Sequence, residues 1–311
     1  MKAAQVTKYG GPEVIQVSEI DKPTVKEGQV LVEICDASLN PFDYKVRSGA
    51  YQKFIPLTLP YIPGGDFSGV VVEVGVGVQN FKAGEHVYGT ANVAGGASGS
   101  LAEYAAAKIG QTAPKPKNVG HSEAAASVLV GISALQALDG HLKLKTGQKI
   151  LIHGGAGGIG HVAIQYAKYL GAYVATTARQ ADVDFVKSLR ADEVIDYEKQ
   201  SFEDVTKDYD VAFDTVGGDV YIKSFQVLKK GGKVVSMIEQ PDEQLAGQRV
   251  VEAIYQSSQI DSKSLQKLAE LIDDGVIKVH IDKQFPLDQT TEAFKHLETG
   301  HPRGKVVVKI K

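Results

Sequence analysis

Apolar runs, glycine-rich turns and helical patterns follow one another through the middle of the chain. Residues 150–152 form an apolar run of the kind found in a buried parallel strand. A turn rich in glycine comes next. Apolar residues then recur at helical spacing from Val162 to Leu170, and Gly171 ends the pattern. This order predicts a strand, a tight turn and a helix.

The same alternation continues to about residue 237. The expected strands are 173–176, 193–196, 211–214 and 233–237, and a helix is expected at 181–189. A helix is also expected at 121–140, with Ser122 as its N-cap and Glu123 in its first turn. Strands that alternate with helices predict a doubly wound parallel sheet, with a ligand at the carboxyl ends of the strands.

The first third of the chain has another pattern, with short strand-like runs and frequent Gly and Pro. Strands are expected near 13–17, 29–34 and 69–78. Further on, 264–273 is an amphipathic helix with a core-facing stripe of Leu265, Leu268, Leu271 and Ile272, and 300–311 is a turn and a last strand. The prediction is an α/β protein in which a partly open β-barrel accompanies the parallel sheet.

Length and composition limit the possible functions. A chain of 311 residues suggests about two domains. The net charge of −3 and the lack of a basic block argue against nucleic acid as a partner. The one cysteine, Cys35, excludes a disulfide framework within the chain. No membrane span is expected, and the N-terminus has no apolar signal segment, so a cytoplasmic location is expected by default.

The glycine-rich turn carries the first candidate chemistry. Gly155, Gly157 and Gly160 give the spacing G-x-G-x-x-G between the expected strand and helix, which is typical of a dinucleotide site. Gly155 is expected to allow the tight turn, Gly157 the approach of the phosphate, and Gly160 the packing of helix on strand. With Gly158 and Ile159, they are expected to hold a pyrophosphate through backbone N–H groups. A purely structural glycine loop is the alternative.

Cofactor choice is expected to depend on the end of the second strand. An NAD enzyme carries Asp or Glu there to accept from the ribose 2′-hydroxyl. Arg179 stands at that position, about twenty residues after the glycines. A guanidinium can bind a 2′-phosphate through two hydrogen bonds. The prediction is therefore NADP(H), with a solvated surface arginine as the alternative.

Further segments occur in a recognisable order. They are Asn40-Pro41-Phe42-Asp43, Pro63-Gly64-Gly65-Asp66, residues 78–88 (VQNFKAGEHVY) and the C-terminal stretch GHPRGKVVVKI. Together with the glycine turn, they resemble the quinone and enone reductase branch of the medium-chain dehydrogenase/reductase superfamily over essentially the whole chain. The resemblance implies a GroES-like barrel domain at 1–122 plus 261–311 and a Rossmann domain at 123–260. It also suggests a homodimer.

A zinc site is not expected. Zinc-dependent members of that superfamily use two Cys and one His, whereas the matching positions here are Asn40, Gly65 and roughly Leu129. The scattered residues His86, His121 and His153 are expected to be ordinary surface or turn histidines.

The resemblance also implies contacts with the cofactor beyond the glycine turn. The residues at the matching positions are Asn40, Lys45, Ser133, Tyr197, Val216, Ser236, Met237, Ile238, Arg303 and Lys305. Simpler alternatives are open for several of them. Asn40 is expected to fix its loop, Ser133 could bond its own backbone, Tyr197 could be a packing residue, and Arg303 and Lys305 could be exposed charges at the chain end.

The expected reaction is hydride transfer from NADPH to a small quinone or to the C=C bond of an enone. Either acceptor develops negative charge on oxygen, so a hydrogen-bond donor is needed there. Lys45, at a position where related enone reductases carry lysine, is the leading candidate, and Tyr51 is the second. A plain surface lysine and a barrel-packing tyrosine are the alternatives. Enoyl-thioester reduction and a non-catalytic NADPH-binding structural role are the competing functions.

Overall fold

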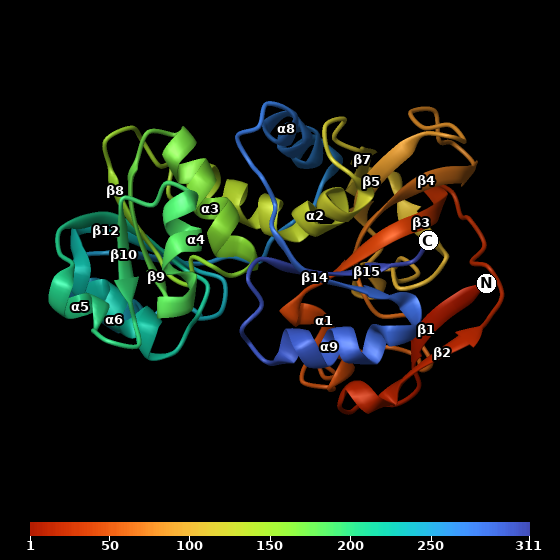
Figure 1. The fold of residues 1–311 in the computed structure, drawn as a ribbon, viewed down its shortest axis with the longest axis horizontal. Helices are drawn as coiled ribbons and strands as arrows, with labels where there is room; N and C mark the ends of the chain where they lie inside the picture. Colours follow the sequence, from red (N-terminus) through yellow and green to blue (C-terminus); the bar gives the residue numbers. More distant parts are fainter. The chain divides into compact units, whose positions relative to one another are not determined.

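The computed structural model describes residues 1–311, which Figure 1 colours along the sequence. The chain divides into two compact units. The first unit comprises Met1–Leu129, Ile260–Asp274 and Val279–Lys311. The second comprises Val130–Gln259 and Gly275–Lys278. Helix α2 (His121–Leu135) begins in the first unit and ends in the second.

The second unit is built on a sheet of six parallel strands. In spatial order they are β10 (Glu193–Asp196), β9 (Tyr173–Ala178), β8 (Lys149–Ile152), β11 (Tyr209–Asp214), β12 (Leu228–Ser236) and β13 (Glu252–Tyr255). The chain runs outward from β8 to β10 and then returns to β11 on the other side. Ligands of such sheets bind where the strand order reverses, at the carboxyl ends of the strands.

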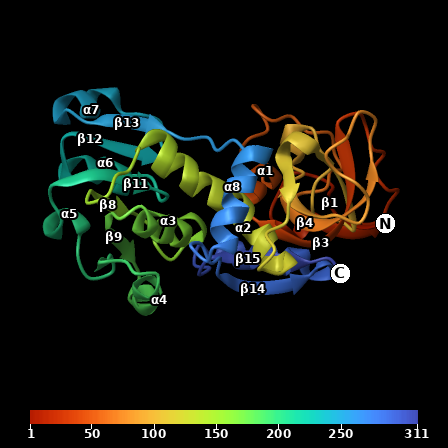
Figure 2. The same cartoon turned by 90° about the horizontal axis from the view of Figure 1, so that it is seen from above.

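Helices cover both faces of this sheet. They are α3 (Gly158–Tyr169), α4 (Val183–Ser188), α5 (Phe202–Val205), α6 (Asp219–Val227) and α7 (Glu243–Arg249). The second unit also contains the π-helix η4 (Gln136–His141), which follows α2, and the 3-10 helix η5 (Gln180–Asp182). Helix α3 lies on one face and α5 and α6 lie on the other (Figures 1 and 2). Leu151, Phe202 and Phe225 are buried together on the second face, as expected for strands that bury both sides.

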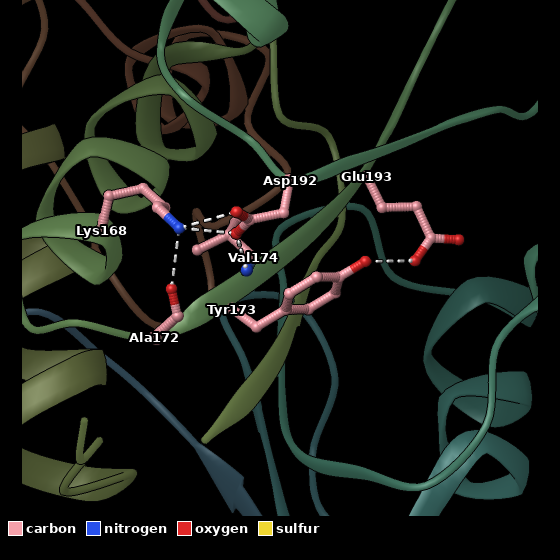
Figure 3. Close-up of polar contacts among 6 residues, drawn as sticks. All are labelled: Lys168, Ala172, Tyr173, Val174, Asp192 and Glu193. Carbon is pink, nitrogen blue, oxygen red and sulfur yellow. Dashed lines mark hydrogen bonds and ion pairs between the residues drawn. The ribbon is translucent and has the colours of Figure 1, made fainter. Parts of the chain in front are cut away.

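Polar contacts join the end of α3 to the start of the neighbouring strands. Figure 3 shows Lys168 Nζ against both carboxylate oxygens of Asp192, at 2.9 and 2.6 Å. The same carboxylate accepts from the backbone N–H of Val174 at 2.7 Å, and the Tyr173 hydroxyl donates to Glu193 at 3.3 Å. These contacts fix the end of the sheet opposite the glycine turn.

The first unit is a β-structure of mostly antiparallel strands. One sheet has the order β14 (Ile281–Pro286), β15 (Lys305–Lys309), β3 (Gln29–Leu39), β4 (Asp66–Val74), β5 (His86–Thr90) and β7 (Thr112–Pro114), and β6 (Tyr104–Lys108) also pairs with β3. A second pair consists of β1 (Lys2–Val6) and β2 (Ile15–Glu19). Only the pairing of β14 with β15 is parallel.

Short helices complete the first unit. They are α1 (Pro41–Arg47), α8 (Ser262–Asp273), α9 (Thr290–Glu298), η1 (Pro12–Val14), η2 (Val93–Gly95), η3 (Ile109–Gln111) and η6 (Leu287–Gln289). Helix α1 lies beside α9 (Figure 1). None of the helices in the structure has both the length and the apolar character needed to cross a membrane.

The predicted fold class is confirmed, although several bounds differ. Strand β10 and the buried stripe of α8 are as predicted. Strand β3 extends to Leu39, five residues beyond the expected end, and so leads directly into the segment at Asn40. Ser122 is not an N-cap: α2 begins at His121, and the Ser122 hydroxyl donates to Asp36 at 3.0 Å. Strand β13 was not expected, because its half-exposed edge position leaves no clear alternation.

Candidate cofactor and active site

A tight turn joins β8 to α3 and forms the candidate phosphate site. Gly154 has a φ of +69°, in the left-handed region that favours glycine. The N–H of Gly157 donates to Gly154 O at 3.0 Å, and the N–H of Gly155 donates to Thr177 O at 3.0 Å. The left-handed backbone conformation that the turn requires is therefore adopted by Gly154, one residue before Gly155, where the motif predicted it.

The motif glycines are required mainly for space. A Cβ on Gly155 would lie 2.1 Å from Thr176 Oγ1, and one on Gly160 would lie 2.1 Å from Gly154 O. Gly157 is less crowded, with 3.3 Å to the same carbonyl oxygen. Gly160 thus allows α3 to pack against the turn itself rather than against a strand.

The first turn of α3 presents backbone donors. The helix begins at Gly158, and its N-cap, Gly157, supplies no side-chain acceptor. The first hydrogen bond of the helix runs from the His161 N–H to Gly157 O at 3.1 Å, so the N–H groups of Gly158, Ile159 and Gly160 have no acceptor within the helix. Such a helix N-terminus suits a pyrophosphate, so this arrangement fits the predicted contacts of these residues with a dinucleotide.

His153 is the first residue of the turn, one of its two expected places, but it is fully buried rather than at the surface. Its Nε2 lies 2.9 Å from Ser224 Oγ, and the Ser224 hydroxyl donates to Val220 O. His153 Nε2 is therefore the donor to Ser224, and Nδ1 faces Thr177 Oγ1 at 3.4 Å. Burial lowers the pKa of His153 to about 4. The neutral ring links the glycine turn, the end of β9 and α6.

One buried carboxylate, Asp214, organises the ends of β11 and β12. Its Oδ1 accepts from the N–H of Val216 at 2.9 Å, and its Oδ2 accepts from the Ser236 hydroxyl at 2.7 Å. The N–H of Met237 donates to Asp214 O at 3.0 Å, and the N–H of Ile238 donates to Ser236 Oγ at 3.1 Å. Four residues predicted to contact the cofactor are therefore gathered around Asp214.

The ends of β9 and β10 bring together the residues predicted at the adenosine 2′ position. Asp196 pairs with Ala178 in register, and the N–H of Tyr197 donates to Ala178 O at 3.2 Å. The Tyr197 residue is 53% exposed, so part of it is accessible, and its contact with the cofactor stays a prediction. Arg179 Nη2 lies 2.8 Å from a carboxylate oxygen of Asp182. The arginine is thus ion-paired rather than simply solvated.

Ser133, on the part of α2 that belongs to the second unit, is buried. Its Oγ lies 2.8 Å from Ser258 Oγ, and its carbonyl accepts from Gln256 Nε2 at 2.9 Å. The hydroxyl therefore has a partner outside its own helix.

In the first unit, α1 carries the predicted catalytic segment. Asn40 caps the helix: its N–H donates to Asp43 Oδ2 at 2.8 Å, and its backbone carbonyl accepts from the Asp43 N–H at 2.9 Å. Lys45 lies on this helix and Tyr51 just after it, and both are half-buried. The Tyr51 ring lies 5.7 Å from that of Phe42. The cap fixes the start of the segment that presents both residues.

A buried charge network lies beneath this segment. Asn40 Nδ2 donates to Asp66 Oδ2 at 2.8 Å, and the N–H of Leu129 donates to the same oxygen at 3.2 Å. Lys305 Nζ donates to Leu39 O at 2.7 Å and to Asn40 Oδ1. Both polar atoms of the Asn40 amide are therefore engaged, which supports its expected role in fixing the loop.

Burial dominates the ionisation of this network. It raises the pKa of Asp43 to about 7, and the nearby Asp66 carboxylate adds to that rise. It also raises the pKa of Asp66 and lowers that of Lys305, although their mutual attraction opposes both shifts. Two acids thus share one buried ammonium, and Asp43 is the group placed to titrate near neutral pH.

The location of Lys305 corrects its predicted role. The side chain is neither exposed at the chain end nor directed to an adenosine phosphate, because its ammonium is committed to Leu39 and Asn40. Arg303 is partly exposed and lies near His280, whose pKa is lowered by burial and by that guanidinium. The contact of Arg303 with a cofactor stays a prediction.

Metal ligands are not gathered anywhere in the structure. No group of three or more His, Cys, Asp or Glu side chains is arranged to hold an ion. His86 Nδ1 instead lies 3.0 Å from His121 Nε2, and His121 Nδ1 lies 2.8 Å from Ser68 Oγ.

Several residues of these sites were not identified from the sequence. His153, Asp214 and Asp66 organise the turn, the second loop and the buried network. Asp214 is the last residue of an apolar strand. A polar residue at the carboxyl end of a parallel strand could have indicated a site residue, because ligands bind at that edge of the sheet. The partners of His153 and Asp66 are distant in sequence, so no local pattern indicated them.

Comparison with known proteins identifies relatives along the whole chain. Two family models match: the alcohol dehydrogenase GroES-like domain at residues 26–117 and the zinc-binding dehydrogenase at residues 189–308. A chloroplastic NADPH-dependent alkenal/one oxidoreductase of Arabidopsis thaliana is 39% identical over 99% of this chain and 79% of its own length.

Two solved structures have a similar fold. The quinone oxidoreductase of Coxiella burnetii is 34% identical, with a TM-score of 0.91 over 100% of this chain and 99% of that one. The quinone oxidoreductase of Escherichia coli, solved in complex with NADPH, is 26% identical, with a TM-score of 0.91 over the full length of both chains.

Replacing Asp43 by Asn is expected to stabilise the protein in a pH-dependent way. The folded state raises the pKa of this acid from 3.8 to about 7, so the folded protein binds the proton more tightly than the unfolded chain does. Ionisation of Asp43 therefore lowers the free energy of unfolding as pH rises from about 4 to about 7. Asp43→Asn removes that loss and keeps an oxygen for the Asn40 N–H.

Thermal unfolding of both proteins from pH 4 to pH 8 measures this effect. The stability gain of Asp43→Asn should grow up to about pH 7 and then stay constant, at about 1.4 kcal/mol for each unit of pKa shift. Asp21→Asn, at an exposed acid, should show no such trend. A gain that is the same at every pH would contradict the prediction.

Proposed function

Because the chain belongs to the NAD(P)H-dependent quinone and alkenal/one oxidoreductase branch of the medium-chain dehydrogenase/reductase superfamily, we propose that it uses NADPH to reduce small quinones or the C=C bond of enones. Arg179, at the carboxyl end of β9, is the observation that carries the cofactor choice. A guanidinium attracts a 2′-phosphate, whereas the acid of an NAD enzyme would repel it. The Arabidopsis relative, named as NADPH-dependent, supports the same choice.

The residues present fit the proposed cofactor. A side chain at Gly155 or Gly160 would collide with its surroundings, and the less crowded Gly157 lies at the start of α3. Its pyrophosphate would meet the N–H groups of the first turn of α3, and its 2′-phosphate would meet Arg179 and Tyr197. Bound NADPH would supply a hydride, which carries the two electrons of the reduction.

The proposed work of the first unit is to stabilise negative charge on the acceptor oxygen. Hydride addition to the β-carbon of an enone leaves an enolate, and a proton then completes the saturated carbonyl product. Lys45 is the proposed donor to that oxygen, and Tyr51 is the second candidate. Both follow the Asn40 cap, which holds their segment in place. The homodimer expected from the resemblance and the cytoplasmic location expected by default stay predictions.

A panel of acceptors tests the reaction. Steady-state oxidation of NADPH should be seen with simple quinones or with short alkenals and enones, and product analysis separates hydroquinone from saturated carbonyl. Turnover confined to crotonyl thioester would favour enoyl-thioester reduction instead. Tight NADPH binding without turnover of any acceptor would favour a structural role.

Arg179→Ala should weaken NADPH selectively. Loss of a hydrogen-bonded charge is worth about 1.5–3 kcal/mol, so the KM for NADPH should rise on the order of 10- to 100-fold while that for NADH stays the same. Steady-state kinetics with both cofactors measure the change. Lys187→Ala, which removes an exposed cation on α4, is the matched control. Equal losses for both cofactors would rule out recognition of the 2′-phosphate by Arg179.

Lys45→Met should lower kcat on the order of 10²- to 10³-fold, because it removes a donor to the developing oxyanion while keeping the length of the side chain. Lys45→Arg should restore part of the rate. The variants are compared by kcat on the best enone or quinone of the panel, with the exposed Lys53→Met as the control. An unchanged kcat in Lys45→Met would remove the proposed catalytic role.

A further inference from the structure

Arg179 is held by a carboxylate three residues later in the chain. Its Nε and Nη2 lie 3.1 and 2.8 Å from the same oxygen, Oδ2 of Asp182. Asp182 is 4% exposed, whereas the Arg179 side chain is 24% exposed. A buried acid thus holds a guanidinium whose side chain is partly exposed.

The atoms involved determine how the guanidinium is turned. Nε and Nη2 form its side edge, and a bond to both fixes rotation about the last bonds of the side chain. The remaining edge, formed by Nη1 and Nη2, then faces away from Asp182. That end edge can bind two oxygens of one phosphate at the same time.

The backbone beneath Arg179 is held independently of this pair. The N–H of Tyr197 donates to Ala178 O at 3.2 Å, and the N–H of Gln180 donates to Glu198 Oε2 at 3.3 Å. These bonds tie the end of β9 to the loop after β10 on both sides of Arg179. The Asp182 N–H also donates to Arg179 O at 2.9 Å. Substitution of the Asp182 side chain keeps all three backbone bonds, so it tests only the hold of the carboxylate on the guanidinium.

We propose that Asp182 is a positioning residue that sets the preference for NADPH over NADH by holding Arg179 ready for the 2′-phosphate. The inference rests on the proposed binding of that phosphate by Arg179. A long, flexible side chain must otherwise lose its rotational freedom when the cofactor binds. Ordering it beforehand removes a cost of about 0.5–1.5 kcal/mol, which corresponds to a two- to tenfold change in affinity.

The carboxylate also carries a negative charge close to the phosphate site. Repulsion between Asp182 and the phosphate would act in the opposite direction to the ordering of Arg179. The two effects can be separated by substitution, because Asn keeps an acceptor oxygen without the charge and Ala removes both. If positioning dominates, Asp182→Ala weakens NADP⁺ binding. If repulsion dominates, both substitutions strengthen it.

Calorimetric titration of the full chain with NADP⁺ and with NAD⁺ tests the proposal. Asp182→Ala should raise the Kd for NADP⁺ two- to tenfold and leave the Kd for NAD⁺ unchanged, whereas Asp182→Asn should change the NADP⁺ value less. Asp184→Asn, which removes an exposed acid on the next helix, should change neither. Tighter NADP⁺ binding in Asp182→Ala, or equal weakening of both cofactors, would overturn the positioning role.

A double-mutant cycle with Arg179→Ala identifies the route of the effect. If Asp182 acts through Arg179, then Asp182→Ala should have no further effect on NADP⁺ binding once Arg179 is absent. A full, additive loss would overturn the proposal. The cycle also separates this inference from its premise, which is that Arg179 binds the 2′-phosphate. If Arg179→Ala alone leaves the ratio of the Kd values for NADP⁺ and NAD⁺ unchanged, then that premise is wrong.

Discussion

The close approach of α3 to the glycine turn is the contact on which the cofactor side of the molecule depends. A Cβ on Gly160 would lie 2.1 Å from Gly154 O, so the helix reaches this position only because no side chain intervenes. The contact brings the first backbone donors of α3 to the carboxyl end of β8. Buried His153 holds the same turn from the other side, through Ser224 and Thr177. The candidate phosphate site is therefore a consequence of packing.

Features that depend on local pattern were predictable from the sequence, and those that depend on distant partners were not. Strand β10, the stripe of α8 and the glycine turn follow from periodicity and spacing. Lys305 was misplaced because its partners, Leu39 and Asn40, are more than 260 residues away in the chain. The start of the helix at His121 was predicted, but the assignment of Ser122 as its N-cap was wrong, since the Ser122 hydroxyl donates to Asp36.

Cations in both units are held by neighbours that limit their freedom. Lys168 is fixed by Asp192, Arg179 by Asp182, and Lys305 by the carbonyl of Leu39 and the amide of Asn40. Burial separates the two basic residues: Lys305 is enclosed, so its charge acts only within its own unit, whereas the Arg179 side chain is 24% exposed. A basic residue in a family segment is thus not enough to indicate a phosphate contact, because the degree of burial decides what its charge can reach.

Selection between the two nicotinamide cofactors must come from outside the glycine turn. NADH and NADPH carry the same pyrophosphate, so the N–H groups of α3 contribute equally to both and add nothing to the difference in affinity that constitutes specificity. Only groups near the ribose 2′ position can distinguish them. In the proposed site those groups are the side chains at the ends of β9 and β10, where an ordered guanidinium would have an advantage over a mobile one. The proposal therefore assigns the binding of a dinucleotide to the turn and the choice between the two cofactors to the neighbouring strand ends.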